Sequence, residues 1–216
     1  MQTLTETLLH QGLGDRILTR AQLERALDVG AAARYGLVNR ALKASELVQV
    51  RRGLYVLSPR LRTEPVHPFA LAQAIVRGSY VSLETALSIH GWIPESVPVI
   101  ASVVPGRKSV MLEHPALGSF AFHPLALERA GFLEAVERRQ FGSQVALVAK
   151  PVRALLDLVA LRKLEWQGLE FLTEGLRIDS HSLAGASRDD LESLEHVYQQ
   201  RRPNEFLRRL TEELRR

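Results

Sequence analysis

Residues 31–57 read AAARYGLVNRALKASELVQVRRGLYVL, and this stretch decides the fold. Its first part, residues 31–45, has apolar side chains at helical spacing. Its second part, residues 47–57, has two short apolar runs on either side of Arg51, Arg52 and Gly53. Glycine tolerates a positive φ, so the second part predicts two strands joined by a tight turn. The stretch as a whole therefore predicts a helix followed by a hairpin.

Two further helices are predicted ahead of this stretch. Residues 3–11 carry apolar side chains at helical spacing and end against glycines. Thr19 and Gln22 form a capping box that begins a second helix, which Gly30 closes, and Ile17 and Leu18 before it could form a small strand. Three helices and then a hairpin is the order of a winged helix-turn-helix.

The rest of the chain predicts a second, mixed domain. Residues 58–68 hold three prolines and break every periodicity, so we divide the chain into domains 1–62 and 63–216. The overall prediction is an α+β protein: an N-terminal winged helix-turn-helix followed by a mixed α/β C-terminal domain that ends in helices. In the second domain we predict strands at 99–104, 109–113, 119–123, 134–139 and 144–148. We predict helices at 69–76 and from Ser82 to His90. From Pro151 onward the chain is predicted to be helical, with breaks near 168, at 179–185 and at Pro203.

The positive charge is concentrated in the first domain. Residues 1–62 hold ten Lys and Arg against five Asp and Glu, and residues 63–216 hold eighteen against nineteen. Lys and Arg supply most of the sequence-independent affinity for the phosphates of DNA. A basic segment joined to a nearly neutral one therefore favours a DNA-binding protein with an appended domain.

The third helix has the pattern of a recognition helix. Helical spacing places Ala31, Tyr35, Val38 and Leu42 on a core face, and it places small and basic residues on the opposite face. Ordinary surface helices share this pattern, but the arginine-tipped hairpin directly after it favours DNA binding. The candidate DNA-binding residues are Arg34 as a flanking phosphate contact, Gly36 for close approach, Asn39 for adenine, Arg40 for guanine, Lys43 for a phosphate, and Arg51 and Arg52 for the backbone or minor groove.

No pattern of a catalytic, cofactor or metal site is present. The chain has no cysteine, and its histidines lack metal-ligand spacing. There is no phosphate-binding glycine loop and no Gly-x-Ser-x-Gly motif. We therefore expect a protein that is not an enzyme and uses no cofactor or metal. We find no secretory leader and no apolar run of membrane-spanning length, so we expect a cytoplasmic protein.

Four segments resemble one known family. Residues 31–44 with 50–57, residues 80–95 (YVSLETALSIHGWIPE) and residues 149–158 (AKPVRALLDL) resemble the AbiEi-like abortive-infection antitoxins, the regulators of type IV toxin-antitoxin systems. The resemblance implies a repressor that binds the promoter of its own operon and counteracts a nucleotidyltransferase-like toxin, without necessarily binding it tightly. It also implies that antitoxin activity resides in the C-terminal domain.

Two alternatives remain open at this point. The chain could be a stand-alone transcription factor whose C-terminal domain senses a ligand or a protein, which a neighbouring nucleotidyltransferase gene would argue against. It could also be a nuclease that uses the first domain to find DNA. The lack of a convincing cluster of acids with a lysine argues against the nuclease.

Overall fold

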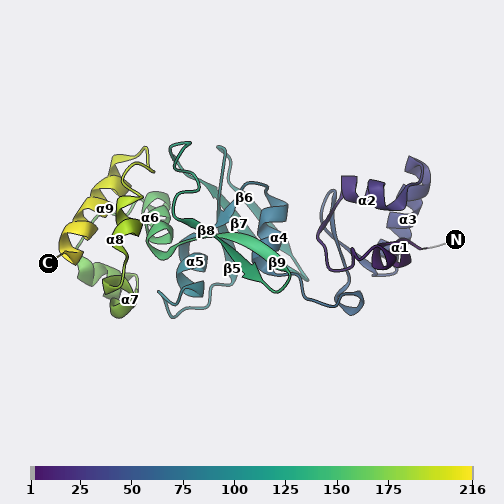
Figure 1. Ribbon diagram of the computed structural model, residues 1–216, viewed down its shortest axis with the longest axis horizontal. Helices are drawn as coiled ribbons and strands as arrows, with labels where there is room; N and C mark the ends of the chain where they lie inside the picture. Colours follow the sequence, from purple (N-terminus) through teal and green to yellow (C-terminus); the bar gives the residue numbers. More distant parts are fainter. Residues whose placement is uncertain (1–2, 216) are drawn as a thin grey trace.

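The computed structural model describes residues 3–215 and is an α+β protein with two lobes (Figure 1). The N-terminal lobe contains three helices and a small sheet, at the places where the sequence predicts helices and a hairpin. Helix α1 spans Leu4–His10, α2 spans Arg20–Leu27 and α3 spans Ala31–Lys43. Strand β1 spans Leu18–Thr19, β2 spans Leu47–Arg51 and β3 spans Leu54–Leu57.

Capping boxes fix where the first two helices begin. The side chain of Thr19 accepts from the backbone N–H of Gln22, and the Gln22 side chain accepts from the backbone N–H of Thr19. Thr3 and Glu6 make the same reciprocal pair at the start of α1. Each pair satisfies two backbone donors that have no partner within the helix.

The sheet of the N-terminal lobe is covered on both faces. Its strands are antiparallel in the order β1-β3-β2. Leu47 and Leu57 pack with the three helices in one apolar cluster. Val50, Leu54 and Val56 pack in another cluster with side chains of the C-terminal lobe. Because side chains alternate along a strand, the hairpin serves two cores at once.

The C-terminal lobe is built on a mixed six-stranded sheet in the order β6-β7-β5-β4-β9-β8. β5 pairs in parallel with β7, and β4 pairs in parallel with β9, while the other pairs are antiparallel. Strand β4 spans Tyr80–Val81, β5 spans Val99–Val104 and β6 spans Val110–His114. Strand β7 spans Gly118–Pro124, β8 spans Val136–Phe141 and β9 spans Gln144–Ala149.

Helices cover this sheet and form the far end of the molecule (Figure 1). A short 3-10 turn, η1, spans Pro59–Leu61 in the connection between the lobes, and a π-helical turn, η2, spans Phe171–Gly175. Helix α4 spans Pro68–Ile75, α5 spans Leu83–Ile89 and α6 spans Pro151–Arg162. Helix α7 spans Ser180–Ala184, α8 spans Arg188–Glu192 and α9 spans Arg201–Leu214. None of the helices in residues 3–215 is both long enough and apolar enough to cross a bilayer.

Several details differ from the sequence-based expectations. The expected break at 179–185 is wrong, because α7 forms there with Asp179 as its N-cap, and the strand β4 was not expected. α9 begins at Arg201 and contains Pro203 in its first turn, where the missing N–H of proline costs no hydrogen bond, so the expected break at Pro203 is wrong. Ser82 precedes α5, but its hydroxyl makes no cap and donates instead to Asp157 at 2.7 Å.

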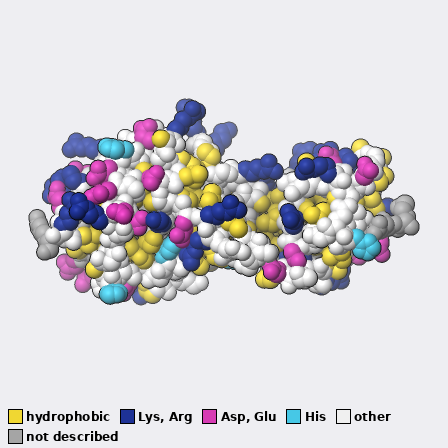
Figure 2. Space-filling view, in the orientation of Figure 1, with side chains coloured by type: hydrophobic (Ala, Val, Ile, Leu, Met, Phe, Trp, Pro, Cys, Tyr) yellow, Lys and Arg dark blue, Asp and Glu magenta, His cyan; other side chains and the backbone are white. Residues whose placement is uncertain are grey.

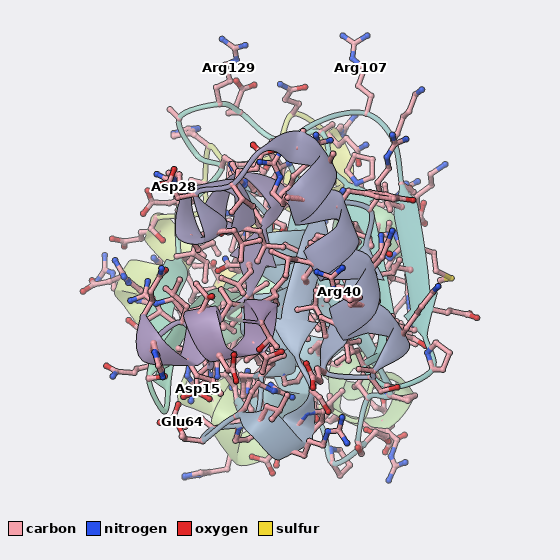
Figure 3. The ribbon with its side chains drawn as sticks, turned by 90° about the vertical axis from the view of Figure 1, so that its right-hand side faces the viewer. Asp15, Asp28, Arg40, Glu64, Arg107 and Arg129 are labelled. Atoms are coloured by element: carbon pink, nitrogen blue, oxygen red, sulfur yellow. The ribbon has the colours of Figure 1, made fainter. Side chains whose placement is uncertain are left out.

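The two lobes meet at a narrower waist (Figure 2). The Asp15 carboxylate accepts from the backbone N–H groups of Thr63 at 2.7 Å and Glu64 at 3.1 Å, and Asp15 and Glu64 lie close together in Figure 3. Glu64 in turn accepts from the hydroxyl of Ser143 at 2.6 Å. Together with the apolar cluster of the hairpin, these bonds attach the N-terminal lobe to the C-terminal one.

Candidate nucleic-acid interface

Helix α3 lies at the end of the molecule away from the C-terminal lobe, with Arg40 on its visible face (Figure 3). Ala41 is its buried anchor, only 4% exposed, and Leu37, Val38 and Leu42 pack partly buried beside it. Four of the predicted residues lie away from this anchor: Gly36 and Asn39 are half-buried, and Arg40 and Lys43 are exposed.

The polar side chains on this face are uncommitted. Across residues 3–215, no hydrogen bond or ion pair involves the side chains of Asn39, Arg40 or Lys43. An amide and two cations that have no partner within residues 3–215 can bind another molecule without breaking a bond inside that part of the chain. This arrangement is what contact with base edges and phosphates requires.

Tyr35 is wrongly placed by the sequence analysis. Its side chain is 71% exposed and Ala31 is exposed too, although helical spacing put both on the core face. The reason is that only the later turns of α3 pack on the core, with Ala41 at the centre of the buried side, so the first turns project beyond it. Tyr35 consequently adds an aromatic ring to the exposed face, one turn before Asn39.

Arg34 is held inside the N-terminal lobe. Its side chain is 18% exposed and forms an ion pair with Glu24 of α2 at 2.9 Å. The same carboxylate oxygen of Glu24 also lies 3.1 Å from Nε of Arg20. Glu24, which the sequence analysis did not single out, thus links α2 to α3. The guanidinium of Arg34 is therefore already paired with a carboxylate, whereas that of Arg40 forms no ion pair within residues 3–215.

Gly36 leaves room for Arg40. A Cβ at Gly36 would lie 3.4 Å from Nη1 of Arg40, which shows that the guanidinium folds back along the helix. The absence of a side chain at position 36 also lowers the profile of the helix at the centre of its exposed face. Both effects would let the α3 backbone approach a flat or grooved partner closely.

The hairpin ends in two exposed arginines. Arg51 and Arg52 lie at the turn between β2 and β3, and Gly53 takes the left-handed conformation there with φ 78°. A β-bulge between Gln49 and Arg51 shifts the register just before the turn. The carbonyl of Gly53 accepts from the N–H of Arg20 at 2.9 Å, so the tip is fixed to the start of α2.

A buried network of polar side chains in the C-terminal lobe was missed by the sequence analysis. Arg153 and Asp157 are both completely buried on α6 and form an ion pair at 3.0 Å. Asp157 accepts from the hydroxyls of Tyr80 at 3.0 Å, Ser82 at 2.7 Å and Tyr198 at 2.8 Å. Arg153 also donates to the carbonyl oxygens of residues 131 and 134. Every member of this network therefore has partners.

Burial and neighbouring groups shift the pKa values of three members of this network. Burial by itself would lower the pKa of Arg153, but the charge of Asp157 raises the pKa above its ordinary value. Burial and the nearby Asp157 raise the pKa values of Tyr80 and Tyr198 well above that of free tyrosine. The buried ion pair and the hydroxyls bonded to it face one another inside the lobe, which suits a structural role. The signal in the sequence was an Arg and an Asp four residues apart in an otherwise apolar helix.

Comparisons with known proteins add nothing to this geometry. A scan against models of protein families gives no match, and a search of curated proteins gives none either. Among residues 3–215, no three His, Asp or Glu side chains converge in a way that would hold a metal ion. The functional proposal therefore rests on the geometry of α3 and the hairpin.

Proposed function

We propose that this protein is a sequence-specific transcriptional repressor that binds double-stranded DNA, and that residues 1–62 form a winged helix-turn-helix. Support comes from the order of the elements, with three helices, a short strand between the first two, and a hairpin paired to that strand. In this proposal α3 enters the major groove and the hairpin is the wing.

The proposed contacts divide into two kinds. Asn39 and Arg40 read base edges, for which the amide suits adenine and the guanidinium suits guanine. Lys43, Arg51 and Arg52 neutralise phosphates and carry no sequence information. The observation that carries the proposal is the outward face of α3, on which an amide and two cations without partners in residues 3–215 surround a glycine.

A binding assay with matched variants tests the proposal. DNase footprinting on the DNA upstream of the gene would locate the operator, and fluorescence anisotropy would then measure affinity. We expect Asn39→Ala and Arg40→Ala each to lose about 1–3 kcal/mol of specific binding. Arg138→Ala is the control, because Arg138 is an exposed arginine on β8 and has no ion pair within residues 3–215. If Arg40→Ala bound as tightly as Arg138→Ala, α3 would not be the reading helix.

We further propose that the repressor is the antitoxin of a type IV toxin-antitoxin system that counteracts a nucleotidyltransferase-like toxin. Two of the segments that resemble the AbiEi-like antitoxins, residues 80–95 and 149–158, are in contact through the buried network of Tyr80, Ser82, Arg153 and Asp157. Residues 80–95 and 149–158, which are far apart in the sequence, are therefore joined by hydrogen bonds inside the C-terminal lobe.

Growth rescue tests the antitoxin role. The adjacent gene would be expressed alone and together with this protein, and we expect this protein to restore growth. A variant with Asn39→Ala and Arg40→Ala should still restore growth under a foreign promoter, because antitoxicity is assigned to the C-terminal lobe. An adjacent gene that is not toxic, or one whose toxicity persists, would leave a repressor without an antitoxin role.

A further inference from the structure

A hollow of about 630 Å³ lies in the C-terminal lobe, on the side of the sheet that α5 and α6 cover. Its volume is within the range of about 300–1,000 Å³ that small-molecule sites occupy. Small side chains on the sheet create it. Ala101 and Ala121 line its floor, whereas Phe120 and Phe122, the residues next to Ala121 on β7, fill the opposite face of the sheet.

The walls of the hollow are mainly apolar, and the charges around it cancel. Leu87, Ile93, Leu158 and other aliphatic side chains line it. At its rim Arg162 pairs with Glu84, and Arg177 pairs with Glu95. An ionic ligand would have to compete with one of these pairs or enter an apolar space unpaired, and both are costly. An uncharged ligand meets neither cost.

One polar side chain inside the hollow can form a hydrogen bond with a ligand. His123 is half-buried on β7 and lines the hollow beside Ala121. Burial lowers the pKa of His123, and the charge of Glu84 offsets this effect only in part. The ring is therefore neutral at neutral pH, and a neutral imidazole offers one donor and one acceptor.

The backbone at the edge of the hollow is strained. Leu83 lines the hollow, is 1% exposed and has φ 57°. The left-handed region costs a non-glycine residue about 1–3 kcal/mol and persists only where the surroundings impose it. Ser82, the residue before it, is held by Asp157, which explains how the conformation is kept. Strain of this kind concentrates at ligand sites.

We infer that this hollow binds an uncharged, lipophilic small molecule that carries a single hydroxyl or carbonyl group for His123. The apolar walls take the body of the ligand, the balanced rim excludes ions, and the imidazole orients the polar group. This site is separate from the proposed DNA-binding face, since none of its lining residues belongs to the N-terminal lobe.

A pair of fluorescent probes tests the inference on the full chain. N-phenyl-1-naphthylamine is uncharged and 8-anilinonaphthalene-1-sulfonate is a related anion, and both brighten in apolar sites. We expect saturable binding of the neutral probe at one site per chain, and binding of the anion that is at least about ten-fold weaker. Decanol should displace the neutral probe. Equal affinity for the two probes, or no saturable binding of the neutral one, would overturn the inference.

Two variants locate the probe. Ala121→Leu fills the floor of the hollow, and Ser96→Trp blocks its rim from an exposed position that the core does not use. Each should weaken binding of the neutral probe about ten-fold or more. Ala130→Leu is the control, because Ala130 is exposed and lies outside the hollow. Should Ala121→Leu fail to fold, Ser96→Trp decides. Wild-type affinity in folded Ser96→Trp would contradict this site.

Discussion

Gly36 has two opposite effects on the protein. In the middle of a helix, glycine lowers stability by about 0.5–1 kcal/mol relative to alanine. We therefore expect Gly36→Ala to raise the free energy of unfolding by about that amount, as urea denaturation would measure. The added methyl group would also lie in van der Waals contact with the Arg40 guanidinium, and it thickens the exposed face. DNA affinity should fall in the same variant. Tighter folding with unchanged binding would show that α3 does not approach DNA at Gly36.

The buried pair of Arg153 and Asp157 gives a second prediction at the level of residues. Asp157→Leu leaves a cation without its partner in the core, and we expect a loss of about 3–5 kcal/mol in the free energy of unfolding. The double variant Arg153→Met with Asp157→Leu removes both charges. It should be more stable than Asp157→Leu alone, as a double-mutant cycle by chemical denaturation would show. Additive losses from the two substitutions would contradict the proposed pairing.

Individual side chains could be predicted only where helical spacing decides their direction. Asn39, Arg40 and Lys43 lie away from the buried Ala41, as that spacing implies. Tyr35 does not follow the prediction, because spacing says which residues share a face and does not say how much of a helix rests on the core. The link from Glu24 to α3 was overlooked because Arg34, unlike its other partner Arg20, comes from a different helix.

At the scale of elements, the hairpin tip should account for part of the salt dependence of DNA binding. Arg51→Ala with Arg52→Ala removes two exposed cations, and each lost phosphate contact lowers the slope of log K against log salt by about 0.9. We therefore expect a slope that is shallower by about 1–2, with affinity reduced equally for specific and random DNA. Anisotropy titrations at several salt concentrations would measure it.

The control for the hairpin tip is another pair of adjacent cations. Arg107 and Lys108 are exposed in the loop between β5 and β6, and neither has an ion pair within residues 3–215. Arg107→Ala with Lys108→Ala lowers the net charge by the same amount. An equal change of slope in both double variants would mean that total charge, and not the hairpin, sets the salt dependence.

Elements were predictable where a capping box, a turn or a long apolar run marks them. The capping box at Thr19 and the positive φ of Gly53 are confirmed, and β5 has the predicted bounds. β4 was missed because two residues have no periodicity of their own, and its place depends on pairing with β5 and β9. Pairing between distant strands is a tertiary effect, which a local pattern does not contain.

At the scale of the whole molecule, the N-terminal lobe should depend on its neighbour. A fragment of residues 1–62 would expose Val50, Leu54 and Val56 and would lose the Thr63 and Glu64 partners of Asp15. We expect this fragment to unfold at a lower temperature than the full chain, or to self-associate. Circular dichroism melts and size-exclusion chromatography would measure both. A monomeric fragment as stable as the full chain would show that the shared cluster contributes little.

The hairpin with two covered faces has a consequence for protein engineering. Residues 1–62 cannot simply be moved to another protein. An unrelated partner would need a new apolar surface to cover the hairpin face that carries Val50, Leu54 and Val56. A chimaera that transplants α4, β5 and β7 along with residues 1–62 preserves this packing surface and is the better starting point for joining them to another protein.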